Sequence, residues 1–141
     1  MNFDSIDRVR PLLWNGEFLR VLDQRVLPHK QEYIDCRSAQ HVAEAIRTLA
    51  VRGAPAIGIA GAYGVVLAAA EVSADNGQAV LQQINDTLDL LENARPTAVN
   101  LRWAVQRMRT VLSSMGADWQ AGLEAEAIAI QTEDLAANRS M

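Results

Sequence analysis

Through the first quarter of the chain, from Leu12 to Cys36, short runs rich in hydrophobic, β-branched and aromatic residues are separated by turn-forming residues, a pattern typical of β-strands. Leu12 to Trp14 and Phe18 to Leu22 flank the dipeptide Asn15-Gly16. Because Asn-Gly readily adopts the positive φ angles of a type I′ turn, this spacing predicts a β-hairpin. Glu32 to Cys36 predicts another strand after the break at Pro28. We therefore expect a small three-stranded antiparallel sheet within about residues 1–36, packed on helices because such a sheet is not stable alone.

From Ser38 onward the hydrophobic spacing becomes helical. Ser38 is a favourable N-cap, and it precedes apolar residues spaced three and four apart on one face: Val42, Ala45, Ile46 and Leu49. This first helix is predicted to end near Arg52-Gly53, where glycine tolerates the left-handed geometry of a C-cap. Pro55 then suits the first turn of a second helix, because its missing N–H is one that helix starts leave unpaired.

The second predicted helix, Ala54 to Ala70, is apolar on every side. A helix with that composition belongs at the centre of a domain. It is shorter than the roughly 20 strongly apolar residues that a membrane span requires, and Pro55 and three glycines interrupt it. We interpret it as a core helix, in which the small residues Gly58, Gly61 and Gly64 let neighbouring backbones approach closely.

Three further helices complete the predicted fold. The first carries an apolar stripe of Val80, Leu81, Ile84, Leu88 and Leu91. Pro96 breaks the pattern, and Thr97 is the predicted N-cap of the next helix, whose inward residues are Leu101, Ala104, Met108, Val111 and Leu112. The last runs from about Trp119 to Ala137. The sum is an α+β fold, a single domain over 1–141 that is strand-rich to residue 36 and helical from 38.

Composition narrows the possible functions. A net charge of -4 and a pI near 5.1 leave no broad basic surface, which argues against a nucleic-acid partner. Cys36 is the only cysteine and Met1 to Arg10 lacks the apolar core of a secretory signal, so we expect a cytoplasmic protein with no membrane segment. His29 and His41 have no metal-type spacing to each other or to Cys36, so no metal site is predicted.

The clearest candidate chemistry lies at two loop-to-helix junctions, each of which carries an arginine. Arg52-Gly53-Ala54 precedes one helix and Arg95 precedes another. A helix start presents unpaired N–H groups and a partial positive charge, and a guanidinium matches the oxygens of phosphate. The residues therefore suggest an anion site. The alternative is glycine used only for packing, with both arginines solvated.

Other residues are weaker candidates for a catalytic or binding role. Cys36 lies on a predicted strand and is expected to be a small core residue, because nothing near it in sequence lowers its pKa. Asp35 and Glu44 form a carboxylate pair only if the fold brings them together. No Ser-His-Asp or Cys-His arrangement can be assembled. The sequence offers binding groups without an acid, base or nucleophile.

Both junctions resemble motifs of the methylthioribose-1-phosphate isomerase family. The string from Val51 to Gly58, continued by Ala60 to Gly64, resembles one signature of that family, and Arg95 to Ala104 resembles another. The likeness extends over most of the chain and includes the Trp14 strand and the closing stretch from Glu133 to Arg139. Two motifs of this length are a far more specific signal than a lone glycine pattern.

The resemblance implies an aldose-ketose isomerase of methionine salvage, acting on a sugar phosphate as a homodimer and without a metal or organic cofactor. It implies that Arg52, Gly53, Ala54 and Arg95 contact the substrate. It also implies that the catalytic cysteine and aspartate lie beyond residue 141, in a Rossmann-like C-terminal domain. Cys36 stands in the wrong motif to be that cysteine, so the resemblance assigns no catalytic residue here and predicts that residues 1–141 alone are inactive.

Three alternatives remain open at this stage. Regulatory subunits of translation initiation factor 2B share the implied architecture and bind sugar phosphates or nucleotides without converting them. Ribose-1,5-bisphosphate isomerase is a similar enzyme with a doubly phosphorylated substrate. A helical packing module would use its glycines for close contact alone. The intact string from Arg95 to Leu101 favours the methylthioribose enzyme over the first two.

Overall fold

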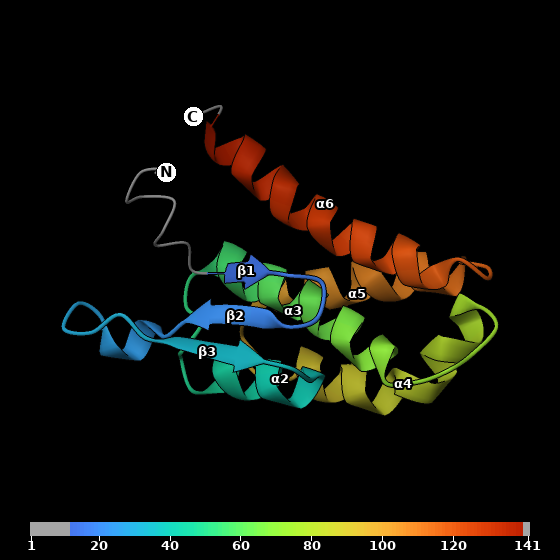
Figure 1. The fold of residues 1–141 in the computed structure, drawn as a ribbon, viewed down its shortest axis with the longest axis horizontal. Helices are drawn as coiled ribbons and strands as arrows, with labels where there is room; N and C mark the ends of the chain where they lie inside the picture. Colours follow the sequence, from blue (N-terminus) through green and yellow to red (C-terminus); the bar gives the residue numbers. More distant parts are fainter. Residues whose placement is uncertain (1–11, 140–141) are drawn as a thin grey trace.

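The structure is a computed structural model that describes residues 12–139, with side chains as far as Asp134. A small sheet packs against a group of helices, as the hydrophobic pattern predicts (Figure 1). The elements in chain order are β1 (Leu12–Trp14), β2 (Leu19–Leu22), the short 3₁₀ helix η1 (Gln24–Val26), β3 (Tyr33–Cys36), α2 (Ala39–Arg47), α3 (Ala54–Ala70), α4 (Gly77–Glu92), α5 (Val99–Ser113) and α6 (Trp119–Arg139).

The sheet has the predicted antiparallel order β1-β2-β3, but its first turn differs from the prediction. Trp14 pairs with Leu19, so the loop covers residues 15–18 rather than two residues. The Asn15 side chain shapes this loop, because its Oδ1 accepts hydrogen bonds from the amides of Glu17 (2.9 Å) and Phe18 (3.0 Å). Only Gly16 of this loop has a positive φ, at 96°, so the predicted type I′ turn is wrong.

The loop between α2 and α3 also departs from the prediction. The helix ends at Arg47, and Leu49 adopts a left-handed φ of 71° at the position where glycine is usual. Val51 then donates its N–H to the Ala45 carbonyl at 3.2 Å. Ala50 and Val51 fill the inward positions, which leaves Leu49 42% exposed. Leu49 is therefore not a core residue of α2, and Gly53 is not its C-cap.

Helix α3 lies at the centre of the domain, as its all-round apolar sequence predicts. It packs against α2, α4, α5 and α6, and its middle turns are fully buried. A Cβ on Gly61 would lie 2.6 Å from Leu101 of α5, and one on Gly64 would lie 2.7 Å from Leu91 of α4. At these two glycines the close neighbours are therefore leucine side chains rather than the predicted backbones. A close backbone is found at Gly58, where a Cβ would lie 3.1 Å from the Asn100 carbonyl oxygen. In the described part of the chain, no helix combines the length and apolar character needed to cross a membrane.

Helix α6 lies along one side of α3 and α5 (Figure 1). Trp119, Leu123, Ala127 and Ile130 form its buried stripe. Two side-chain hydrogen bonds hold it in place: the Trp14 indole donates to Glu124 at 2.7 Å, and the Tyr63 hydroxyl donates to Gln131 at 2.7 Å. These two hydrogen bonds tie α6 to β1 and to α3.

Candidate functional site

A cavity of about 480 Å³ opens between the α2–α3 loop and the α4–α5 loop. We call it the arginine cavity. All four residues singled out in the sequence line it, although the two motifs are far apart in the chain. The full lining is Leu49, Arg52, Gly53, Ala54, Ile57, Arg95, Thr97, Ala98, Val99 and Asn100.

The first wall of the arginine cavity is the start of α3. Gly53 occupies the N-cap position with a φ of 92° and a ψ of 132°, a conformation that favours glycine, and no side chain caps the helix. Nothing lies within 4 Å of the point where a Cβ on Gly53 would stand, so a ligand has free access to this backbone. Pro55 lies in the first turn as predicted, and the amides of Ala54 and Ala56 precede the first helical hydrogen bond, from Ile57 to Gly53.

The second wall is the start of α5. The predicted N-cap, Thr97, is wrong by one residue: Ala98 stands at the N-cap, and it has no side chain with which to cap the helix. The reason is a tight turn in which the Ala98 amide donates to the Arg95 carbonyl at 2.9 Å. Arg102 fixes the same loop through a 2.9 Å hydrogen bond to the Pro96 carbonyl. The arginine cavity therefore has two helix starts without side-chain caps, each with a partial positive charge.

Arg52 is held by a neighbouring element that the sequence motifs did not reveal. Its guanidinium donates to the Gln24 carbonyl of η1 at 2.6 Å, and the Gln24 amide donates back to the Ala50 carbonyl at 3.0 Å. Buried Asp23 caps η1 and binds the Arg25 guanidinium at 2.9 Å. Hydrogen bonding from Arg25 lowers the pKa of Asp23, with a smaller contribution from the charge of Arg52. A backbone acceptor has no residue-type signature, which is why sequence reasoning missed Gln24.

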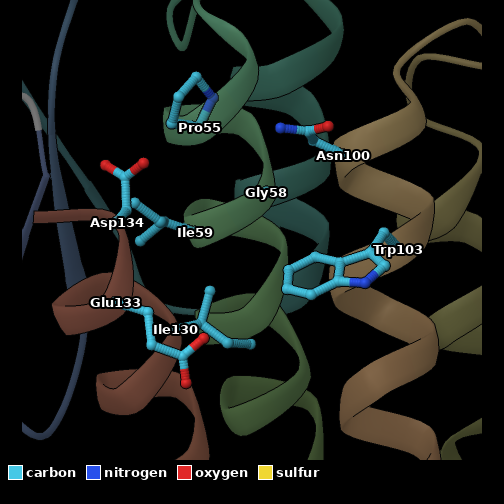
Figure 2. Close-up of a pocket in the computed structure, with 8 residues that line it drawn as sticks. All are labelled: Pro55, Gly58, Ile59, Asn100, Trp103, Ile130, Glu133 and Asp134. Atoms are coloured by element: carbon cyan, nitrogen blue, oxygen red, sulfur yellow. The ribbon is translucent and has the colours of Figure 1, made fainter. Parts of the chain in front are cut away.

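A second, smaller cavity of about 240 Å³ adjoins the first at Asn100, which lines both. We call it the tryptophan cleft. Trp103 and Asn100 project from α5 toward α3, and Ile130 and Glu133 reach toward α3 from α6 (Figure 2). The complete lining is Pro55, Gly58, Ile59, Asn100, Trp103, Ile130, Glu133 and Asp134. Most of these residues fall in the motifs that carry the family resemblance, yet the sequence alone assigned none of them to the site.

The carboxylate pair considered in the sequence has a different role. Asp35 and Glu44 do line one small cavity, but each binds an arginine. Arg20 donates to both oxygens of Asp35 at 2.8 and 3.1 Å, and Glu44 pairs with Arg47 on the same helix. In residues 12–139, no group of three His, Cys, Asp or Glu side chains is arranged to hold a metal ion. The arginine cavity is therefore the better candidate site.

Cys36 is a buried core residue, as predicted. Burial, with a smaller contribution from the charge of Asp35, raises the pKa of its thiol to about 11. Because the thiolate is the reactive form, we expect iodoacetamide at pH 8 to leave Cys36 unmodified in the folded chain and to alkylate it fully in urea. Mass spectrometry of the two samples tests this. Rapid labelling of the folded chain would contradict the assignment of Cys36 to the core.

Taken together, the fold and the arginine cavity define a small α+β domain that presents two helix starts and two arginines to one space. The chain belongs to the initiation factor 2 subunit family, whose sequence model matches residues 50–141.

Individual relatives give a narrower comparison. The chain is 55% identical, over its whole length, to a methylthioribose-1-phosphate isomerase of Xanthomonas oryzae pv. oryzae, and 56% identical to one of Stenotrophomonas maltophilia. It covers 40% of each of these proteins. The chain thus spans well under half the length of the curated relatives it matches.

Solved structures show the same fold. A 5-methylthioribose 1-phosphate isomerase from Pyrococcus horikoshii matches 94% of this chain with a TM-score of 0.80 and 30% identity. Subunit delta of a translation initiation factor eIF-2B from A. fulgidus matches 89% with a TM-score of 0.79 and 37% identity. The chain covers 40% and 37% of those two chains, respectively.

Proposed function

We propose that the protein containing this chain converts 5-methylthioribose 1-phosphate to 5-methylthioribulose 1-phosphate, and that this domain binds the substrate phosphate. The observation that carries the proposal is the convergence of Arg52, Arg95 and two uncapped helix starts on one cavity. The names of the relatives at 55% and 56% identity support the reaction.

The phosphate would be held by complementary charge. Backbone amides at the start of α3 and α5 donate to its oxygens, and the two guanidinium groups supply charged donors. Each such charged hydrogen bond is worth roughly 1.5 to 3 kcal/mol when made. Gly53 leaves the backbone open to the ligand, and the Gln24 carbonyl keeps Arg52 beside the cavity.

The domain would bind and orient the sugar rather than transfer its protons. Among the described residues that line the arginine cavity there is no carboxylate, imidazole or thiol. Because the phosphate occupies the anomeric oxygen, the sugar cannot open to a free aldehyde, so an unusual proton or hydride transfer is required. The cysteine and aspartate implied by the family resemblance would act from the rest of the longer protein.

Two further properties belong to the same proposal. The family resemblance supports a homodimer, and Cys36, buried and the only cysteine in the chain, is consistent with a reducing cytoplasm. The acidic balance of the chain supports a small-molecule partner over nucleic acid.

A second candidate is a regulatory subunit that binds a sugar phosphate or nucleotide without converting it. The likeness to subunit delta of eIF-2B, at 37% identity and a TM-score of 0.79, favours this candidate. The higher identity to the bacterial isomerases over the whole chain favours the enzyme.

The decisive experiment is an assay of the full-length protein. We expect NMR to show methylthioribose 1-phosphate converted to the ketose without added metal or cofactor. A double variant, Arg52→Ala with Arg95→Ala, serves as the control and is expected to lose the activity. Tight binding of the sugar phosphate with no conversion would instead identify a regulatory subunit, and no binding at all would contradict both candidates.

A further inference from the structure

The two adjoining cavities have opposite chemical character. The arginine cavity carries Arg52 and Arg95 and two helix starts, all of which favour an anion. The tryptophan cleft has an apolar floor of Ile59 and Ile130, both buried, and the described residues that line it include no lysine, arginine or histidine. Asn100 is common to both, at the first turn of α5.

We propose that the tryptophan cleft binds the uncharged, apolar substituent of the sugar whose phosphate lies in the arginine cavity. This inference rests on the proposed function and adds the residues that select the substrate. A single ligand would then cross Asn100, with its phosphate on one side and its apolar end on the other. The Asn100 amide, both donor and acceptor, is suited to the hydroxyl groups between them.

The size and surface of the cleft suit such a substituent. A volume of about 240 Å³ is adequate for a thioether but small for a bulky group. Trp103 is the largest side chain in its lining, and this residue is 53% exposed. Sulfur and aromatic rings make favourable contacts. Arg107 lies over the Trp103 ring, with its guanidinium carbon 5.5 Å from the ring centre. The part of the ring that stays exposed, beside two buried isoleucines, is an apolar surface that a ligand can cover.

The charges at the rim disfavour a second phosphate. Glu133 accepts two hydrogen bonds from Arg107, at 2.9 and 2.8 Å, and Asp134 adds another carboxylate to the lining. Arg107 is already committed to Glu133 and also to Glu126, at 2.6 Å, so its charge is balanced by carboxylates. A doubly phosphorylated sugar would place its second phosphate beside these carboxylates, and the described residues that line the cleft include no lysine or arginine to receive it.

Substrate selectivity of the full-length enzyme tests the inference. The probes are methylthioribose 1-phosphate, ribose 1-phosphate, which has a hydroxyl in place of the thioether, and ribose 1,5-bisphosphate. For Trp103→Ala we expect the KM for methylthioribose 1-phosphate to rise about tenfold, since an apolar contact of this size is worth roughly 10- to 200-fold in selectivity. The KM for ribose 1-phosphate should change less than about twofold.

Two further variants separate a role in selectivity from a role in folding. Leu90→Ala on α4 is the matched control, because Leu90 is 48% exposed and lines neither cavity, and it should change no KM. Trp103→Arg places a cation in the cleft and should improve use of the bisphosphate relative to the thioether substrate.

The possible results distinguish a failure of the proposed role of the cleft from a failure of the proposed isomerase function. If the KM of Trp103→Ala rises equally for all three sugars, or if Trp103→Arg does not improve use of the bisphosphate, the cleft does not bind the apolar substituent. Neither result would contradict the proposed isomerase function. A wild-type protein that binds none of the three sugars would overturn the proposed function, and the cleft with it.

Discussion

Replacing Gly77 with alanine is expected to destabilise the fold by about 3 kcal/mol or more, the upper range for overpacking a well-packed site. Gly77 is the first residue of α4, and its amide donates to the Met115 carbonyl at 2.8 Å. A Cβ at this position would lie 1.8 Å from the Leu112 carbonyl oxygen. Because that oxygen belongs to the backbone of α5, no side-chain rotation can relieve the overlap, and the two helices must separate.

Gly116→Ala provides the matched control for this prediction. Gly116 lies in the α5–α6 loop and does not have a positive φ, and no atom lies within 4 Å of the point where its Cβ would stand. Its replacement should change stability by less than about 1 kcal/mol, and in the stabilising direction through the unfolded chain. Urea unfolding followed by circular dichroism measures both variants. Equal midpoints for Gly77→Ala and the wild type would show that α4 does not pack on α5 as described.

The helical registers could be predicted from the sequence because burial repeats with the helical period. Ser38 caps α2 through a hydrogen bond from the His41 amide, as its residue type indicates. The helix ends were less predictable, since they depend on tertiary contacts. Leu49 takes the left-handed position because Ala50 and Val51 are the residues that reach the core. Propensity would have assigned that position to glycine.

The candidate site also has parts that the sequence could predict and parts that it could not. Arg52 and Arg95 could be singled out because a charged, planar donor beside a helix start has a recognisable sequence pattern. Their meeting at one cavity depends on how α3 packs against α5, and the close approach at Gly58, where a Cβ would lie 3.1 Å from the Asn100 carbonyl, is part of that packing. The Gln24 carbonyl and the tryptophan cleft could not be predicted, because a backbone acceptor and a cavity between three helices have no local signature.

Replacing Arg52 with lysine in the full-length protein is expected to reduce kcat/KM by roughly 10- to 100-fold, the equivalent of one charged hydrogen bond at about 1.5 to 3 kcal/mol. Lysine keeps the positive charge but lacks the planar fork. It cannot donate to the Gln24 carbonyl, which now takes one guanidinium N–H at 2.6 Å, and also present a paired set of donors to a phosphate. The loss should appear mainly in KM, because phosphate binding is common to substrate and transition state.

Arg47→Lys is the appropriate comparison for this variant. Arg47 lies at the end of α2, its side chain is 56% exposed, and it pairs with Glu44 rather than lining the arginine cavity. An exposed pair of this kind contributes less than about 1 kcal/mol, so both kcat and KM should stay near the wild-type values. Steady-state kinetics on the three proteins decides the matter. If Arg52→Lys keeps the wild-type kcat and KM, as Arg47→Lys should, the paired donors of the Arg52 guanidinium do not bind the phosphate, and this prediction is wrong.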